Sequence, residues 1–126
     1  SPSARVTGTG SEAVNQIANI AAGWNYQFKL SSVGSHDGWG LGGDGAGNCV
    51  DMAEEAQTLF EQAGIESRIV DGTCDSSSGA NGRIGHVWIE FKDPQTGQRT
   101  MFDPTGAALQ HNPNGAFTNP LNNIPN

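Results

Sequence analysis

One stretch constrains the fold more than any other: a helix that begins at a cysteine and leads directly into a predicted strand. Apolar residues recur at three- and four-residue spacing from Cys49 to Ala63, which predicts one buried helical face. Asn48 is a good N-cap, and Gly64 can supply the left-handed residue that ends a helix. The following residues 65–70 read as a strand. Any fold of this chain must therefore place a thiol at the start of a buried helix.

The position of Cys49 matters chemically, because a helix N-terminus carries partial positive charge and unpaired N–H groups. Both favour a thiolate, and the N–H groups can also donate to an oxyanion. Two alternatives stay open, since Cys49 and Cys74 could form one structural disulfide or could both be buried, inert thiols. We place Cys74 in a flexible loop, residues 71–83, and expect it to be unpaired.

Two alternating segments, residues 85–91 and 99–103, predict a β-hairpin around a turn that contains Pro94 and Gly97. One register would place opposite charges across the hairpin and would also set a histidine beside an aspartate. The three pairs of that register are Glu90–Arg99, Trp88–Met101 and His86–Asp103.

The whole chain predicts a single α+β domain, in which the Cys49 helix packs on a small antiparallel sheet. A helix from Ser11 to Ala22, capped by Ser11, precedes it. We divide the chain into a linker or artificial junction at 1–10, a catalytic domain at 11–110 and an Asn- and Pro-rich tail at 111–126. The chain beyond Thr105, which is dense in Asn, Pro and Gly, is expected to wrap the surface without regular structure or to stay mobile.

Charge and hydropathy limit the classes of partner. A net charge of −7 argues against nucleic acid and against an anionic membrane surface, because both attract basic patches. No apolar run is long enough to span a bilayer, and no signal peptide is visible after Ser1. We expect a monomer.

Together, Cys49, His86 and Asp103 supply the parts of a thiol nucleophile triad. A thiolate attacks a carbonyl, an imidazole exchanges the proton with the leaving amine, and a carboxylate holds the ring in the correct tautomer. Taken alone, His86 could be a satisfied or surface histidine, and Asp103 a turn acid before Pro104. Their combination with Cys49 favours catalysis.

Three segments that carry these residues, NCVDMAEEAQTLFEQAGIESRIVDG, GHVWIEF and MFDPT, resemble the core of the transglutaminase-like cysteine peptidase superfamily. The resemblance implies a papain-like α+β core and an acyl-enzyme mechanism that needs no cofactor. In the Gly47-Asn48-Cys49 entry, the preceding GTGSEAVNQIAN helix and its compact size, the chain is further similar to pseudomurein endoisopeptidases of methanogen viruses and prophages. That similarity implies hydrolysis of an Ala–Lys isopeptide bond in the archaeal cell wall, by an enzyme that is released at host lysis or acts outside the cell.

Two rival functions remain on the same residues. One is an acyl transferase of the transglutaminase type, which would pass the acyl group to an amine. The other is a non-catalytic module that retains the fold and binds cell wall or metal. Which acceptor or substrate is used depends on the shape of the pocket, which residue types do not define.

Further site residues are predicted upstream of the nucleophile. The Cys49 N–H is the expected first oxyanion donor, and candidates for the second donor or for substrate contact are Trp39, Asn25, Tyr26 and Trp88. Simple packing is the alternative role for Trp39 and Tyr26.

The Gly-rich segment 34–47 carries Asp37 and Asp44, which could ligate calcium together with backbone carbonyls. The family resemblance implies a divalent requirement. However, no EF-hand spacing is present, so a solvated acidic loop is the favoured interpretation of this segment.

Overall fold

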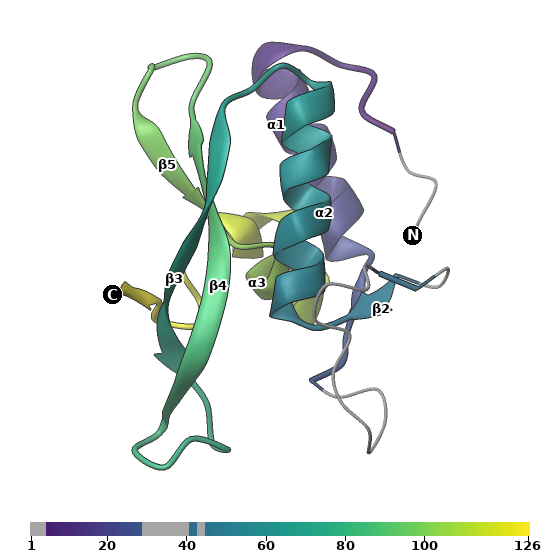
Figure 1. The fold of residues 1–126 in the computed structure, drawn as a ribbon. Helices are drawn as coiled ribbons and strands as arrows, with labels where there is room; N and C mark the ends of the chain where they lie inside the picture. The colour runs from purple at the N-terminus through teal and green to yellow at the C-terminus, as the bar shows by residue number, and fades with distance from the viewer. Residues whose placement is uncertain (1–4, 29–40, 43–44) are drawn as a thin grey trace.

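The computed structural model describes residues 5–28, 41–42 and 45–126, and these form three α-helices and a curled antiparallel sheet (Figure 1). In chain order the elements are α1 (Gly10–Ala22), β1 (Asn25–Tyr26), β2 (Ala46–Gly47), α2 (Cys49–Gln62), β3 (Ser67–Asp75), β4 (Arg83–Lys92), β5 (Arg99–Phe102), α3 (Pro104–Gln110), the 3₁₀ helix η1 (Pro113–Ala116) and β6 (Ile124–Pro125). The main sheet has the order β5-β4-β3-β6. Helix α2 packs on one side of it, against β3 and β4, and α1 lies on the same side, packed on α2 and α3. The predicted α+β class, with the Cys49 helix packed on an antiparallel sheet, is confirmed.

Helix α2 begins at Cys49 because its N-terminus is capped from both directions. The Asn48 side chain accepts from the N–H groups of Val50 and Asp51, each at 3.1 Å, and Asp51 Oδ2 accepts from the Asn48 N–H at 3.1 Å. Such a capping box contributes about 1 kcal/mol or more. The helix ends where Gly64 takes a φ of 71°, as the sequence predicted.

The core lies between α2 and the sheet, and three phenylalanines form its centre. Phe60 of α2 stacks on Phe91 of β4 at 5.0 Å between ring centroids, and it meets Phe102 of β5 edge-on at 5.1 Å. All three are at most 2% exposed, and each contributes about 2 to 3 kcal/mol by burial. This contact fixes the helix relative to the strands that carry the candidate site.

Helix α1 was predicted from Ser11 to Ala22 with Ser11 as its cap, and the assignment of the cap is wrong. The helix begins at Gly10, and its N-cap position is Thr9, which makes no side-chain capping bond. The N-terminal turn is held instead by Gln16, whose Oε1 accepts from the N–H groups of Thr7 and Gly8 at 2.9 and 2.7 Å.

The predicted hairpin register is also wrong, by two residues. Glu90 faces Met101 rather than Arg99. The two charged side chains find other partners, because Glu90 accepts from Arg68 of β3 at 2.9 Å and Arg99 donates to Glu66 at 2.9 Å. A shift of two residues leaves every side chain on the same face of the sheet, so the register error does not reverse the facing.

Ladder pairing of Trp88 with Met101, and of His86 with Asp103, is ruled out by the same register, since the β4–β5 ladder ends at Phe102. Asp103 instead follows β5 and is the N-cap of α3. In each predicted pair, the two residues are therefore offset along the strands and do not lie opposite each other.

Residues 71–83 were predicted as a flexible loop, which is wrong for most of the segment. Strand β3 continues to Asp75 and pairs with β4 up to Arg83, so Cys74 is a strand residue that is only 4% exposed. Arg83 joins the two strands here, because its guanidinium donates to the Thr73 carbonyl and to Asp75 Oδ1, each at 2.8 Å.

The tail after residue 110 contains regular structure, contrary to expectation. Its asparagines act as caps and left-handed turn residues: Asn112 caps η1, and Asn119 and Asn122 have φ of 55° and 52°. Beyond them β6 pairs with β3, with Pro125 opposite Gly72. The Asn- and Pro-rich composition therefore encodes tight turns that return the chain to the sheet.

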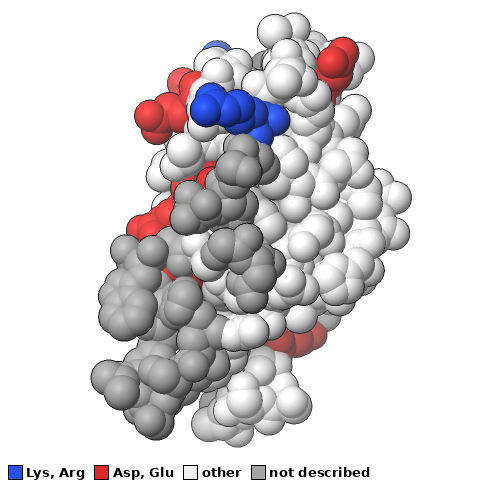
Figure 2. Space-filling view, turned by 90° about the vertical axis from the view of Figure 1, so that its right-hand side faces the viewer, with Lys and Arg blue, Asp and Glu red and all other residues white. Residues whose placement is uncertain are grey.

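In a second, two-stranded sheet, β1 runs parallel to β2 and places Tyr26 opposite Gly47, just before the start of α2. Within the described ranges, no helix is long and apolar enough to cross a membrane. On the face shown in Figure 2, Lys and Arg form one small group near the top, and most of the described surface is uncharged.

Candidate active site

A buried histidine and a buried aspartate meet at the end of the sheet. His86 of β4 is 5% exposed and Asp103 is fully buried, and His86 Nε2 donates to Asp103 Oδ2 at 2.8 Å. The other carboxylate oxygen, Oδ1, accepts from the Thr105 N–H at 2.9 Å, because Asp103 caps α3. The structure thus brings the predicted His86 and Asp103 together through a helix cap rather than through a strand ladder.

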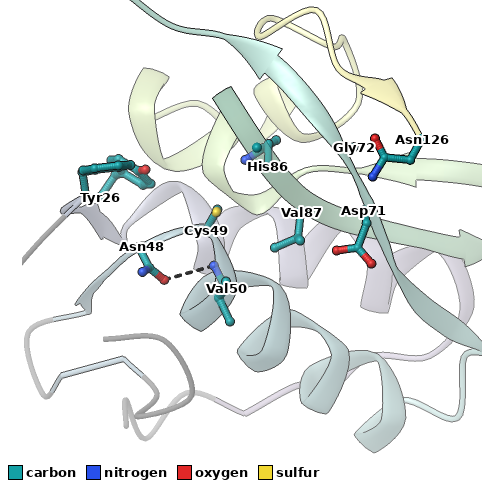
Figure 3. Close-up of a pocket in the computed structure, with 11 residues that line it drawn as sticks. Tyr26, Asn48, Cys49, Val50, Asp71, Gly72, His86, Val87 and Asn126 are labelled. Atoms are coloured by element: carbon teal, nitrogen blue, oxygen red, sulfur yellow. Dashed lines mark hydrogen bonds between the residues drawn. The ribbon is translucent and has the colours of Figure 1, made fainter. Parts of the chain in front are cut away.

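Cys49 faces the same histidine from the first turn of α2, and its sulfur points toward His86 (Figure 3). Burial alone would lower the pKa of His86, but hydrogen bonds to Asp103 and Cys49, reinforced by the charges of these two residues, raise it to about 9. At neutral pH the imidazolium form is therefore favoured, held between a carboxylate and a thiol.

The ring orientation of His86 follows from these contacts. Because Nε2 is the nitrogen that donates to Asp103, Nδ1 is the nitrogen available to Cys49 and to a bound substrate. Trp88 packs against the ring, with centroids 5.7 Å apart and planes at 25°, which limits its rotation. The imidazole is thus held at Nε2 by Asp103 and on its ring face by Trp88.

A pocket of about 610 Å³ opens over Cys49 and His86. Figure 3 shows Tyr26 on one side of these two residues and Asp71 on the other. The described residues that line the pocket are partly aromatic and aliphatic, and one of them has an acidic side chain: Tyr26, Phe28, Asn48, Cys49, Val50, Asp71, Gly72, Gly85, His86, Val87 and Asn126. This volume is in the usual range for small-molecule and peptide sites.

One N–H group at the start of α2 is left for an oxyanion. The capping box uses the N–H groups of Asn48, Val50 and Asp51, and the Met52 N–H donates to the Asn48 carbonyl. The Cys49 N–H makes no hydrogen bond within the described part of the chain. A tetrahedral oxyanion formed on Cys49 could therefore accept from this group without displacing another partner.

The remaining predicted site residues differ in their position. Tyr26 lines the pocket, whereas Asn25 is an exposed residue of β1 outside its lining, and Trp88 is buried behind His86. Trp39, Asp37 and Asp44 lie outside the described residues. Within the described part of the chain, no group of three or more His, Cys, Asp or Glu side chains could hold a metal ion.

Cys49 and Cys74 are both free, so the disulfide alternative does not describe this structure. Burial raises the pKa of the Cys74 thiol, and the negative charges of Asp103 and Cys49 raise it further. A thiol that is hard to ionise is a poor nucleophile. Of the two cysteines, Cys49 is the one that lines the pocket.

Sequence reasoning missed one polar residue beside Asp103. The side chain of Asn123, 8% exposed, donates from Nδ2 to Asp103 Oδ2 at 2.8 Å. The composition of the tail predicts irregular structure and so does not direct Asn123 to the site. The only available signal was the density of asparagine, which in this chain marks caps and turns.

The family model described as the transglutaminase-like superfamily matches residues 3–103, a range that contains Cys49 and His86 and ends at Asp103. No curated protein matches the sequence.

Proposed function

The chain belongs to the transglutaminase-like superfamily, and on this premise we propose that it is a cysteine peptidase that hydrolyses an amide or isopeptide bond through an acyl-enzyme. The superfamily includes both cysteine peptidases and acyltransferases. The observation that carries the proposal is the buried His86–Asp103 hydrogen bond of 2.8 Å, placed beside a pocket-lining thiol at a helix N-terminus.

The proposed reaction begins with the Cys49 thiolate and the His86 imidazolium. The sulfur attacks the carbonyl carbon, and the oxyanion accepts a hydrogen bond from the Cys49 N–H. His86 then gives its Nδ1 proton to the leaving amine, the C–N bond breaks, and a thioester remains. Water attacks the thioester, His86 takes the proton of that water, and the carboxylic acid leaves as the thiolate reforms. No step uses a cofactor.

Asp103 has a supporting role in this scheme. Its carboxylate accepts from Nε2 throughout the cycle, which keeps Nδ1 directed at the sulfur and stabilises the imidazolium. Full burial makes this interaction stronger than it would be in water. The calcium hypothesis is separate, because it rests on Asp37 and Asp44, which lie outside the described residues.

The proposed substrate is the Ala–Lys isopeptide bond of archaeal pseudomurein. This rests on the sequence similarity of the segment around Gly47, Asn48 and Cys49 to endoisopeptidases of methanogen viruses and prophages. The pocket supports it by its size and by its largely uncharged lining, which suits a peptide stem rather than a phosphate. The protein would act alone on the cell wall, after host lysis or outside the cell.

Incubation with methanogen wall sacculi tests the proposal, with newly released primary amines as the measured product. The wild-type protein should release amines, Cys49→Ala should release none, and the matched control Cys74→Ala should retain most activity. Added hydroxylamine would divert the thioester to a hydroxamate if transfer competes with hydrolysis. Amine release that survives Cys49→Ala would overturn the proposal in favour of a binding module.

A further inference from the structure

The Asp103 carboxylate accepts three hydrogen bonds, and one of them comes from a segment far along the chain. Oδ2 accepts both from His86 Nε2 and from Asn123 Nδ2, each at 2.8 Å, while Oδ1 accepts from the Thr105 N–H at 2.9 Å. Three donors therefore define the position and the plane of the carboxylate, and two of them converge on the oxygen that binds the histidine.

The orientation of the Asn123 amide is set by this contact. An ionised carboxylate only accepts hydrogen bonds, so the amide nitrogen must face Asp103. As a result Asn123 Oδ1 is buried and has no hydrogen-bond partner among the described residues. A buried, unpaired carbonyl is unfavourable, and an aliphatic residue at this position would avoid it. The presence of an asparagine is therefore better explained by its donor to Asp103 than by packing.

The backbone around Asn123 is held firmly. Its own N–H donates to Asn119 Oδ1 at 2.7 Å, and the next residue, Ile124, pairs with Thr73 in the β6–β3 ladder. Arg83 donates to the carbonyl of the preceding residue, Asn122, at 2.9 Å. The amide is thus presented from a fixed backbone on both sides.

We propose that Asn123 is a positioning residue of the active site, which acts on the reaction through Asp103. This positioning role rests on the proposed function, because it requires His86 to carry the proton in the reaction. Without the Asn123 donor, the Asp103 carboxylate can turn about its Cα–Cβ and Cβ–Cγ bonds. The hydrogen bond from His86 Nε2 to Oδ2 then loses its alignment. The His86 ring would then spend less time with Nδ1 directed at Cys49.

Two variants at this position and one in the same segment separate positioning from folding. Asn123→Ala removes the donor, and Asn123→Asp keeps the shape but places a second carboxylate 2.8 Å from the first. The matched control is Asn122→Ala in the same turn. It removes a side chain that donates to Asp75, and it places alanine at a backbone position with a left-handed φ, so it loosens the turn. Thermal unfolding of each variant confirms that it is folded.

We expect Asn123→Ala to lower kcat about 10- to 100-fold with little change in KM, whereas Asn122→Ala keeps near wild-type kcat. For Asn123→Asp, the two adjacent carboxylates repel, and one binds a proton as the pH falls. The protonated group can then donate as the asparagine did. The ratio of variant to wild-type rate should therefore rise toward acid pH, which a merely structural role would not produce.

A second measurement does not depend on the substrate. The rate of Cys49 carbamidomethylation by iodoacetamide, followed by mass spectrometry across pH, reports the thiolate–imidazolium pair. Asn123→Ala should move the onset of rapid labelling to higher pH, because a misaligned Asp103 stabilises the imidazolium less. Asn122→Ala should not.

The outcomes of the two measurements are distinguishable. If Cys49→Ala retains amine release, the proposed function fails, and the labelling curves alone decide the role of Asn123. If wild-type activity depends on Cys49 but Asn123→Ala matches Asn122→Ala in kcat and in labelling, the positioning role is overturned and the proposed function stands. A rate ratio for Asn123→Asp that does not change with pH would also overturn it.

Discussion

Replacement of Asp103 by asparagine tests the site most severely, because the carboxylate faces donors on all sides. Thr105 N–H approaches Oδ1, and the side chains of His86 and Asn123 approach Oδ2. Asp103→Asn keeps the shape and burial but replaces one acceptor by an NH₂ group. Wherever that group points, it meets at least one donor.

The asparagine amide at position 103 can take two orientations, and the one with its NH₂ group in the Oδ2 position costs less free energy. With NH₂ in the Oδ1 position, the Thr105 N–H loses its cap, and two buried donors face each other, at about 1 to 3 kcal/mol. With NH₂ in the Oδ2 position, Asn123 can turn over and accept with its otherwise unpaired Oδ1. His86 must then accept at Nε2, which forces its proton onto Nδ1.

The second orientation puts the histidine in the wrong tautomer for its task. Nδ1 faces Cys49 and must be free to take a proton, so the neutral ring can no longer act as a base. The same exchange in a serine protease triad lowers kcat about ten-thousandfold, which corresponds to about 5 kcal/mol of barrier. We expect a comparable fall here, together with a loss of about 1 kcal/mol in the free energy of unfolding, because neutral hydrogen bonds replace those to a charged carboxylate.

The assay pairs kcat on wall sacculi with urea unfolding of the same samples. The matched control is Glu90→Gln on β4, the strand that carries His86. It breaks only the surface pair with Arg68, which contributes about 1 kcal/mol or less, and it lies away from the pocket. Asp103→Asn with full activity would refute the proposed role of the carboxylate. Loss of stability without loss of kcat would show that Asp103 serves only as a helix cap.

Three further predictions concern other parts of the site. Iodoacetamide should label native Cys49 rapidly and Cys74 slowly, and Cys49→Ala should abolish the rapid phase; rapid labelling that persists in this variant contradicts the assignment of the nucleophile. Because the pKa of His86 is raised from 6.5 to about 9, its stabilising effect is complete below pH 6.5 and is lost as the pH rises through 9; urea unfolding should detect on the order of 3 kcal/mol, and a flat profile would contradict the imidazolium. Gly72→Ala should lower the unfolding free energy by about 1 to 3 kcal/mol, because its Cβ would collide with Trp88 and the backbone of β6; an unchanged thermal midpoint would show that β6 yields without cost.

The parts of the fold that the sequence predicted well are those set by short-range signals. Helix α2 begins at the cap formed by Asn48 and Asp51 and ends before Gly64, and the helical spacing of its apolar residues defines the buried face. The hairpin predicted that His86 and Asp103 meet, and they do, although the predicted ladder pairing is wrong. Each of these inferences depends on residues within one or two turns of each other, or on a face that a register shift of two does not change.

The parts that were missed depend on partners distant in sequence. Glu90 and Arg99 carry opposite charges, but each pairs with a residue on or beside β3 instead, so charge matching within the hairpin gave a wrong register. Asn123 could not be assigned to the site, because its contact with Asp103 exists only after β6 joins the sheet. The oxyanion and calcium predictions at Trp39, Asp37 and Asp44 fall outside the described residues.

The pairing of β6 with β3 has a consequence for the nascent protein. A ribosome delivers Cys49 and its helix well before Asn123 and the strand β6 that directly follows it. Until that strand has left the exit tunnel, the carboxylate of Asp103 lacks one of its three donors. The thiol is therefore synthesised long before the surroundings that would make it reactive, and a chain cut short before β6 would carry a helix, a sulfur and an imidazole that are poorly aligned for attack on any amide bond.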